Sequence, residues 1–430
     1  MDDIPSWIDI DSLLKSQEST DERLEFDLQL NGRGGSNHRA NIRLFDAPDN
    51  FEPEITFYRD SAAWCPYCEK VWLQLEEKRI PYRVEKVPLR CYGSKPAQFM
   101  RMNPSGGLPV AVIRGSTMSE SNDIMMRIER DFPSYNPLLP PKGSKDFDRV
   151  APLMKLERQA FSTWFQWMTS RSDQGRDMDA VLRLVDAALA SSGGPYFLGP
   201  QLSLVDLLFT PFLERMAASL PYFKGFQART PQYPNLLRWY EAMDGRPAYQ
   251  GIKSDYYTHC QDLPPQIGPC PLLPAAAPFQ ARIDGADWAV SVSAGACFEP
   301  MLPLCEHTAS RTAVRNLLLN HAAVAAFCTR AASLAAGRTG GTVSAPLADP
   351  NTPPEPSLVP VVDSALRWIS LSLLQKPEEP LQIERSSAKQ LAACLLYLRD
   401  RIGVPRDMTV HAARQLRAHI NLFLDSHRLR

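Results

Sequence analysis

The chain has 430 residues, more than one ordinary hydrophobic core accommodates, so we expect two or three domains. Its formal net charge is −1 and 44% of its residues are hydrophobic, a composition typical of a soluble globular protein. This balance provides no excess of basic surface, and we therefore predict no nucleic-acid partner.

The nine cysteines and the start of the chain bear on its compartment. An odd number of cysteines in a long chain without a signal-peptide pattern favours a reducing compartment over a disulfide scaffold. No apolar run approaches the roughly 20 residues that span a bilayer. We predict that the protein is not secreted, has no transmembrane segment, and resides in the cytoplasm or a plastid.

The first 53 residues form an acidic extension. A short amphipathic stretch contains Ile8, Ile10, Leu13 and Leu14, and a glycine-rich polar stretch follows at 31–36. Such a composition buries little apolar surface, so we expect this extension to be partly ordered at most.

From residue 54 the hydrophobic periodicity alternates between strand and helix. It predicts strands at 55–58, 83–87, 110–113 and 117–118, and helices at about 66–79, 96–102 and 121–131. This order, β-α-β followed by β-β-α, predicts an α/β domain at 54–133. Its core is a mixed four-stranded sheet with helices packed against it.

The next segment, 145–257, is predicted to be entirely helical. Helical spacing of apolar residues occurs at 146–170, 177–190 and 207–216 and again from 234. Ser203 and Asp206 have the spacing of a capping box at the start of the third of these helices. Proline- and alanine-rich stretches then mark 258–360 as a linker with a helical segment, and 361–430 as a helical C-terminal extension.

The clearest chemical signal is Trp64-Cys65-Pro66-Tyr67-Cys68, between the first strand and the first helix of the α/β domain. A cysteine at a helix N-terminus is favoured as thiolate, and Pro66 suits the first helical position. Half of a zinc site is the rival interpretation. A structural zinc site needs a second pair of ligands, and the sequence offers none with that spacing, so we favour thiol chemistry and predict no metal.

Several motifs together resemble the glutathione transferase family. They are Cys65-Pro66-Tyr67-Cys68, Asn103-Pro104-Ser105-Gly106 followed by Pro109-Val110, Glu120-Ser121, the capping box, and Arg246-Pro247-Ala248-Tyr249. The resemblance covers about 54–257 and is strongest to the cysteine-type members, the omega, lambda, dehydroascorbate-reductase and glutaredoxin-like groups. It implies a thioredoxin-like N-terminal domain followed by an all-α transferase domain, to which this chain adds a mostly helical C-terminal extension.

The resemblance also implies a glutathione site. Cys65 corresponds to the catalytic position, and Pro109 to a proline in a cis peptide bond after a residue, here Leu108, whose backbone binds glutathione. Glu120 and Ser121 correspond to the residues that hold its γ-glutamyl group. Lys95 stands where omega-like members have a lysine for the glycyl carboxylate. A plain helix cap and a solvated lysine are the alternatives for Glu120-Ser121 and for Lys95.

Three aromatic residues, Tyr67, Phe161 and Trp164, are expected near a pocket for the second substrate. Aromatic residues at helical spacing are more often part of a hydrophobic core, and this alternative stays open.

The expected function is that of a glutathione-dependent thiol transferase or reductase. Cys65 is expected to attack a small or protein mixed disulfide, or an oxidised small molecule, and glutathione serves as co-substrate. The part played by Cys68 stays open. The alternatives are a glutathione-dependent isomerase and a transferase fold kept as a scaffold, in which the C-terminal extension binds a partner protein. A homodimer is a further expectation from the resemblance.

Overall fold

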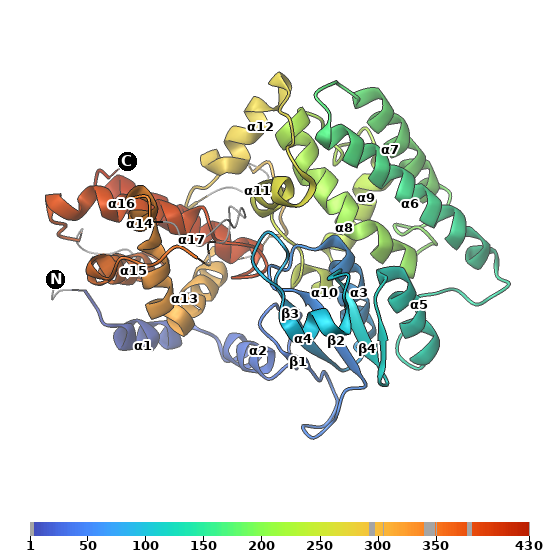
Figure 1. Cartoon of the computed structure of the whole chain (residues 1–430), viewed down its shortest axis with the longest axis horizontal. Coiled ribbons are helices and arrows are strands. Elements are labelled where there is room, and N and C mark those ends of the chain that lie inside the picture. Colours follow the sequence, from blue (N-terminus) through green and yellow to red (C-terminus); the bar gives the residue numbers. More distant parts are fainter. Residues whose placement is uncertain are drawn as a thin grey trace. The chain divides into compact units, whose positions relative to one another are not determined.

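The computed structural model describes residues 4–291, 297–303, 305–338, 349, 351–375 and 381–429. The chain divides into two compact units, coloured along the sequence in Figure 1. One unit comprises Glu25–Arg90 and Ser94–Asp284, and the other comprises Met1–Leu24, Cys91–Gly93 and Gly285–Arg430. Each unit is described by itself.

The unit that begins at Glu25 contains a five-stranded mixed sheet in the order β1-β3-β2-β4-β5. Only β2 and β3 are parallel neighbours; the other neighbouring pairs are antiparallel. The strands are β1 (Ile42–Arg43), β2 (Ile55–Asp60), β3 (Tyr82–Val87), β4 (Val110–Ile113) and β5 (Ser116–Met118). This confirms the predicted thioredoxin-like sheet. The sequence analysis missed β1, which adds a fifth strand at the edge.

Three helices accompany the sheet, α3 (Pro66–Lys78), α4 (Ala97–Met102) and α5 (Ser121–Asp131). Phe99 of α4 packs with Val87 and Val110 on one face of the sheet. Helices α3 and α5 contact each other, and Gln74 Nε2 donates a hydrogen bond of 3.0 Å to the carbonyl oxygen of Met125. The first turns of both helices belong to the candidate site.

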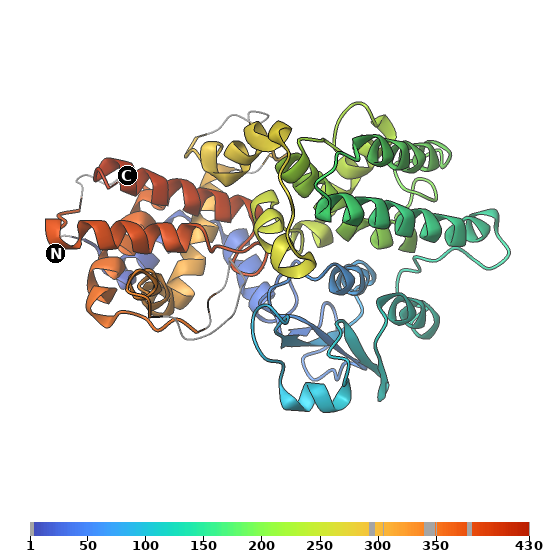
Figure 2. The same ribbon diagram turned by 45° about the horizontal axis from the view of Figure 1, so that its top comes forward.

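A helical layer completes the predicted two-domain arrangement. It contains α6 (Lys145–Thr169), α7 (Gly175–Ala190), α8 (Leu204–Ser219) and α9 (Pro234–Asp244), the green helices of Figure 2. The capping box of Ser203 and Asp206 is present at the start of α8. Asp206 Oδ1 also accepts a hydrogen bond of 2.9 Å from Trp239 Nε1 of α9. Because α8 is buried along its whole length and contacts α3, it lies at the centre of this unit.

The same unit continues through α10 (Pro247–Gln250), α11 (Tyr256–Ile267) and α12 (Ala277–Ala281). The sequence analysis places a linker from residue 258. The structure instead has helix α11 there, with Thr258, His259 and Cys260 buried. The Cys260 Sγ lies 3.4 Å from the carbonyl oxygen of Ala218 in α8, so this added helix is part of the packed core.

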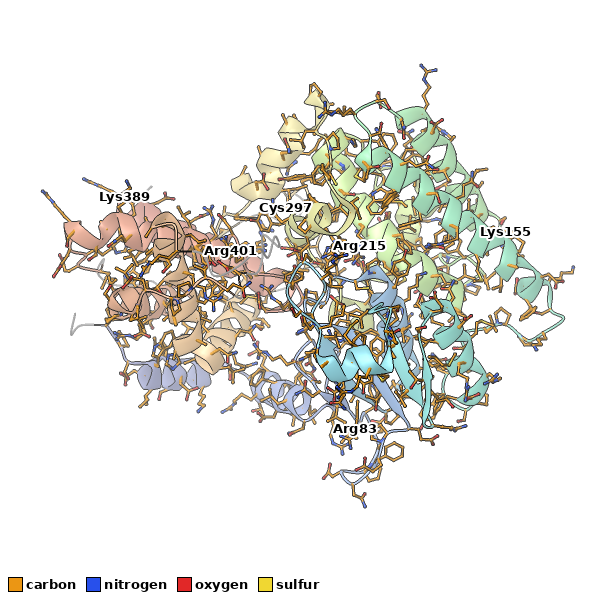
Figure 3. The ribbon with its side chains drawn as sticks, in the orientation of Figure 1. Arg83, Lys155, Arg215, Cys297, Lys389 and Arg401 are labelled. Atoms are coloured by element: carbon orange, nitrogen blue, oxygen red, sulfur yellow. The ribbon has the colours of Figure 1, made fainter. Side chains whose placement is uncertain are left out.

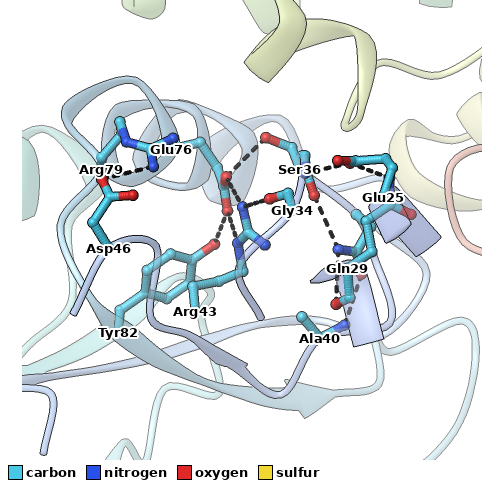
Figure 4. Close-up of polar contacts among 12 residues, drawn as sticks. Glu25, Gln29, Gly34, Ser36, Ala40, Arg43, Asp46, Glu76, Arg79 and Tyr82 are labelled. Atoms are coloured by element: carbon cyan, nitrogen blue, oxygen red, sulfur yellow. Dashed lines mark hydrogen bonds and ion pairs between the residues drawn. The ribbon is translucent and has the colours of Figure 1, made fainter. Parts of the chain in front are cut away.

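The segment before residue 54 is also joined to the core. Figure 4 shows Glu76 of α3 accepting two hydrogen bonds of 2.8 Å from Arg43 of β1. The same carboxylate accepts hydrogen bonds of 2.8 Å from Ser36 Oγ and 2.7 Å from Tyr82 OH. The Arg43 and Glu76 side chains are each only 2% exposed. A segment expected to be partly ordered at most is therefore attached to α3 by a buried ion pair.

The other unit is helical. It contains α1 (Trp7–Gln17), α13 (Glu306–Cys328), α14 (Arg330–Ala335), α15 (Val359–Leu374), α16 (Arg385–Arg399) and α17 (Val410–Ser426). Helix α2 (Thr20–Leu30) contains the boundary between the units. Trp7 Nε1 of α1 donates a hydrogen bond of 2.8 Å to Asp363 Oδ1 of α15. One short 3₁₀ turn of this unit lies at Pro356–Leu358. The unit that begins at Glu25 has short π and 3₁₀ turns at Leu220–Lys224 and Pro274–Ala276, and a further π turn at Arg282–Ala286 crosses the boundary between the units.

Two segments of the helical unit, Glu306–Ala335 and Pro356–Leu374, are long and apolar enough to cross a membrane by length and composition. The sequence analysis identified no such segment and predicted that the chain has no transmembrane segment. Both segments contribute to a buried core, through residues such as Leu317 and Leu366. Buried core helices meet the same criterion, so length and composition do not establish a membrane span.

The buried pair of Arg43 and Glu76 gives a test of this fold. We expect Arg43→Met to lower the free energy of unfolding by about 3 kcal/mol, because it leaves the Glu76 carboxylate buried without its cation. Arg83→Met, which removes the exposed ion pair with Glu52, is the matched control and should change stability by less than about 1 kcal/mol. Equal midpoints of urea unfolding for the two variants would contradict this account.

Candidate active site

Cys65 lies at the N-cap position of α3, directly before Pro66 in the first helical position. Its side chain is only 7% exposed. The first N–H groups of a helix have no intrahelical partners and carry partial positive charge, and Cys65 stands directly before them. The structure therefore places the predicted nucleophile where its sequence context suggests.

The loop before β4 reaches the same sulfur. The Leu108–Pro109 peptide bond is cis, as the resemblance implies. The Leu108 carbonyl oxygen lies 3.9 Å from the Cys65 Sγ. The structure thus brings together Cys65 and the backbone of Leu108, residues that are 43 positions apart in the sequence.

Glu120 and Ser121 lie at the start of α5. Glu120 has a positive φ of 25°, which is uncommon for a residue with a side chain, and its carboxylate forms no capping hydrogen bond. Ser121 is only 8% exposed. Within the described part of the chain, neither the Glu120 carboxylate nor the Ser121 hydroxyl has a hydrogen bond or ion pair. Both side chains are therefore available to a ligand, which is not expected of a plain helix cap.

Lys95 lies between β3 and α4. Its Nζ donates a hydrogen bond of 2.8 Å to the carbonyl oxygen of Pro88. Its side chain also lies beside Gly106, where an added Cβ would be 3.4 Å from the Lys95 Cδ. Lys95 is thus next to the loop that carries the cis proline.

The three aromatic residues predicted for a substrate pocket differ in burial. Tyr67 and Phe161 are half-buried and both contact Phe212, with ring centroids 5.8 and 4.9 Å apart respectively. Trp164 is only 2% exposed, and its Nε1 donates a hydrogen bond of 2.9 Å to Ser219 Oγ. Trp164 therefore has the position of a core residue, while Tyr67 and Phe161 present a partly accessible aromatic surface.

Two further groups lie next to the Cys65 thiol. Cys68 and Asp60 are each only 1% exposed, and the ligand atoms of Asp60, Cys65 and Cys68 lie within 4.8 Å of one another. Burial, the contact with Cys65 and the nearby Asp60 charge raise the pKa of the Cys68 thiol well above its usual value. Cys68 is therefore held as a neutral thiol at pH 7.

Both backbone polar groups of Trp64, the residue before Cys65, form hydrogen bonds to charged side chains. The Trp64 N–H donates a hydrogen bond of 2.6 Å to Asp60 Oδ2. The Trp64 carbonyl oxygen accepts a hydrogen bond from Arg215 of α8, a residue labelled in Figure 3. Arg215 also donates a hydrogen bond of 2.9 Å to Glu69 Oε2 in the first turn of α3. Arg215 therefore connects the helical layer to both ends of the turn that carries Cys65.

Behind Arg215 lies a buried carboxyl pair, Glu69 and Glu214. Burial and the Glu214 charge raise the pKa of Glu69 well above its usual value. Burial also acts to raise the pKa of Glu214, but contacts with His259, Arg215 and Tyr249 outweigh it and lower that pKa to about 2. The two carboxyl groups thus have pKa values shifted in opposite directions, and both lie next to the Arg215 guanidinium.

Lys70 is a buried cation on the same helix. It is only 1% exposed, and within the described residues its one hydrogen bond is a long contact of 3.4 Å with Asn122 Oδ1. Its Nζ lies 5.0 Å from the centroid of the Phe212 ring. Burial lowers the pKa of Lys70 to about 8, and the charges of Glu157 and, less strongly, Cys65 oppose this shift. Lys70 therefore carries its charge at pH 7 in a buried position.

The sequence analysis missed Asp60, Glu69, Lys70, Phe212 and Arg215. One signal for Arg215 was present, because Glu214 and Arg215 interrupt an otherwise apolar helix, and adjacent opposite charges in such a run indicate buried pairing. The positions of the others depend on which face of a helix or which end of a strand meets Cys65. Spacing along the sequence does not specify this.

Arg215 can be tested as a positioning residue. Lysine cannot reproduce the forked contacts of arginine, so Arg215→Lys should slow alkylation of Cys65 by iodoacetamide about 10- to 100-fold. Peptide mass spectrometry follows the modification of Cys65 specifically. Arg183→Lys, at an exposed ion pair with Asp179, is the matched control. A variant with lower thermal stability but an unchanged alkylation rate would show that Arg215 acts on folding alone.

Lys70 gives a prediction with a defined pH dependence. Its pKa in the folded protein, about 8, lies below the ordinary value of 10.5. The buried charge therefore lowers the free energy of unfolding by its full amount below pH 8 and by less and less as the pH rises to 10.5. We expect Lys70→Met to raise the free energy of unfolding by about 1–3 kcal/mol at pH 7 and by less at pH 9.5. Denaturant unfolding at both pH values is the measurement. The exposed Lys155→Met is the control, and a destabilised Lys70→Met at pH 7 would refute the proposed cost of burial.

Two known domain families match this chain. Residues 64–131 match the glutathione S-transferase N-terminal domain family, and 156–242 match the glutathione S-transferase C-terminal domain family. Glutathione S-transferase DHAR2 of Arabidopsis thaliana is 25% identical over 195 residues, which cover 44% of this chain and 84% of that protein. Glutathione S-transferase L3 of the same plant is 27% identical over 212 residues, 49% of this chain and 86% of that protein.

Among solved structures, glutathione transferase Omega 3C from Trametes versicolor has 26% sequence identity and a TM-score of 0.43, with 48% of this chain and 91% of that chain covered. The matches to the N-terminal and C-terminal domain families, together with the glutathione S-transferase relatives, support the glutathione S-transferase superfamily for residues 64–131 and 156–242 of this chain.

Proposed function

We propose that this protein is a glutathione-dependent thiol transferase that acts through the Cys65 thiolate. The observation that carries the proposal is the position of Cys65, at the N-terminus of α3 and 3.9 Å from the carbonyl oxygen before a cis proline. This arrangement offers a nucleophilic sulfur beside a backbone group that can bind the cysteinyl part of a peptide thiol.

The relatives support the same general chemistry. Glutathione transferases named DHAR and L are among the proteins that this chain resembles, and they imply glutathione-dependent thiol reductase or transferase chemistry. These relatives include chloroplastic and cytosolic proteins, in keeping with a reducing compartment. The identity of the acceptor is not carried by these names.

We assign the glutathione contacts as follows. The Leu108 backbone, beside Pro109, binds the cysteinyl part, and Glu120 with Ser121 binds the γ-glutamyl ammonium and carboxylate. The carboxylate of Glu120 and the hydroxyl of Ser121 have no other partner in the described part of the chain, which supports this assignment. Lys95 lies beside the same loop and is assigned to the glycyl carboxylate.

The reaction has two displacement steps. In the first, the Cys65 thiolate attacks the glutathione sulfur of a mixed disulfide; a Cys65–glutathione disulfide forms and the acceptor leaves as a thiolate. In the second, a glutathione thiolate attacks that disulfide, which releases glutathione disulfide and restores the Cys65 thiolate. Each step breaks one disulfide and forms one, so the mixed disulfide and one added glutathione thiolate become the acceptor thiolate and glutathione disulfide.

The environment of Cys68 favours glutathione over Cys68 as the resolving thiol. A thiolate is the attacking species, and burial keeps Cys68 protonated at pH 7. Glutathione in solution has no such restriction. We therefore propose that the main cycle uses one protein thiol and that Cys68 is not required for turnover.

The acceptor side of the site is proposed from the aromatic surface. Tyr67 and Phe161 are half-buried around Phe212, and they would contact the part of the mixed disulfide that leaves. Trp164 supports Phe161 from the core, with ring centroids 5.9 Å apart. A homodimer, or a partner protein bound by the C-terminal helical unit, stays a prediction from the sequence.

The proposal is tested with the mixed disulfide of glutathione and 2-mercaptoethanol, in an assay coupled to glutathione reductase. We expect Cys65→Ser to lower kcat/KM by at least about 1,000-fold, because the nucleophile is lost. Cys68→Ser should retain at least about a third of the wild-type activity, since glutathione resolves the intermediate. Full activity of Cys65→Ser would rule out the mechanism, and loss of activity in Cys68→Ser would assign resolution to the protein.

The glutathione contacts have a separate readout. Glu120→Gln removes a charged partner of the glutamyl ammonium and should raise KM for glutathione about 10- to 100-fold with a smaller change in kcat. The exposed Glu85→Gln on β3 is the control. An unchanged KM for glutathione in Glu120→Gln would remove Glu120 from the proposed site and leave the role of Cys65 standing.

A further inference from the structure

Asp60, Cys65 and Cys68 form a set of potential metal ligands. Their ligand atoms, one carboxylate oxygen and two sulfurs, lie within 4.8 Å of one another. All three side chains are buried, with exposures of 1%, 7% and 1% respectively. In the described part of the chain, no other group of three histidine, cysteine or acidic residues is gathered in this way.

The separations are close to those of a tetrahedral zinc site. Bond lengths of about 2.3 Å to sulfur and 2.0 Å to oxygen correspond to ligand separations of about 3.8 Å between sulfurs and 3.5 Å between sulfur and oxygen. Starting from separations of at most 4.8 Å, the ligand atoms would therefore have to approach one another by at most about 1.0 Å between sulfurs and about 1.3 Å between sulfur and oxygen. Rotation of the cysteine side chains can provide a movement of this size without unfolding the first turn of α3.

The surroundings of Asp60 also suit a metal ligand. Ligating carboxylates are commonly oriented by a hydrogen bond to one of their oxygens. Here the Trp64 N–H donates such a bond of 2.6 Å to Asp60 Oδ2. Coordination through the other oxygen leaves this bond intact. The adjacent Arg59, fully buried and hydrogen-bonded through Nη1 to the Asp60 carbonyl oxygen, adds positive charge beside an anionic ligand set.

We propose that Asp60, Cys65 and Cys68 bind one thiophilic divalent cation, zinc or cadmium, with a solvent molecule in the fourth position. Both sulfurs bind as thiolates, so each one that is still protonated releases its proton to the solvent when the ion binds, and no oxidation or reduction takes place. The sequence analysis rejected a zinc site for want of a second cysteine or histidine pair. The third ligand is instead a carboxylate at the end of β2, five positions before Cys65.

Binding of the cation excludes thiol transfer by the same sulfur. A coordinated Cys65 has its reactive electron pair engaged with the metal, so the loaded protein cannot attack a mixed disulfide. The site would thus make a thiol transferase sensitive to free zinc or cadmium. This consequence rests on the proposed function, whereas binding itself does not, and the two are therefore tested separately.

Binding is measured on the full chain, reduced with a phosphine and kept free of oxygen. Zinc affinity is obtained by competition with a chromophoric chelator, and cadmium binding by its ultraviolet thiolate-to-metal charge-transfer band. We expect one ion per chain. Cys65→Ser and Cys68→Ser should each lower zinc affinity by about 100-fold or more, and Asp60→Asn by about 10- to 100-fold. Cys305→Ser, which removes an exposed cysteine, is the matched control and should leave the affinity unchanged.

X-ray absorption of the zinc-loaded wild-type protein gives a second readout that does not depend on variants. We expect two sulfurs at about 2.3 Å and oxygen ligands at about 2.0 Å. A zinc shell with fewer than two sulfurs would overturn the proposal, as would equal zinc affinities of the wild type and a folded Cys65→Ser/Cys68→Ser variant. Neither result depends on glutathione or on turnover, so both stand apart from the test of thiol transfer.

Discussion

The geometry of the site depends on the backbone of Trp64, because its N–H group and its carbonyl oxygen are both hydrogen-bonded to buried charged side chains. Asp60 accepts its N–H from the end of β2, and Arg215 donates to its carbonyl oxygen from α8. Hydrogen bonds to charged groups are stronger than those between neutral groups, and burial protects them from competition by water. The residue that follows, Cys65, therefore has a position set jointly by the sheet and by the helical layer.

Helix α3 is contacted by arginine side chains near both of its ends. Its first turn is bound by Arg215 through Glu69, and its last turn is bound by Arg43 of β1 through Glu76. The added helix α11 supports the first of these contacts, since His259 lies 2.5 Å from Glu214 in the cluster behind Arg215. Of the segments outside the two matched domains, the one with Arg43 thus contacts the last turn of α3, and α11 contacts Glu214 of α8, next to the arginine that binds the first turn. This gives those segments a structural reason to persist around a thiol site.

Much of the fold was predictable because its signals are local. The strands and helices between 54 and 244 follow from periodicity and turn residues, and Ser203 was correctly identified as the N-cap of α8, although the helix itself extends three residues beyond the predicted 207–216 at each end. Strand β1 was missed because two residues carry no alternation. Helix α11 was missed because Pro264 and Pro265 near its end suggested a linker, whereas its first two turns are buried against α8. Tertiary contacts stabilise such elements, and these contacts cannot be predicted from a local sequence pattern.

The residues of the candidate site likewise fall into those that a local motif identifies and those that only the fold brings together. Cys65, Pro109 and Glu120 belong to motifs, so their roles follow from residues adjacent in the chain. Asp60 and Arg215 act only through the fold, the first by ending a strand beside Cys65 and the second by crossing from another helix. A buried charge is costly unless it is paired, so each buried charge near a reactive group raises the question of what it pairs with.

The Asp60 carboxylate has a partner in the structure, the Trp64 N–H group, and its chemistry suggests a bound cation as a second. The hydrogen bond from Trp64 uses one carboxylate oxygen. Burial, the contact with Cys65 and the Asp60 charge together raise the pKa of the Cys68 thiol. A divalent cation bound between the three groups would instead favour the ionised Cys68, because its positive charge attracts both the carboxylate and the thiolate. The carboxylate that opposes ionisation of Cys68 is therefore also the one that would favour a metal in the proposed site.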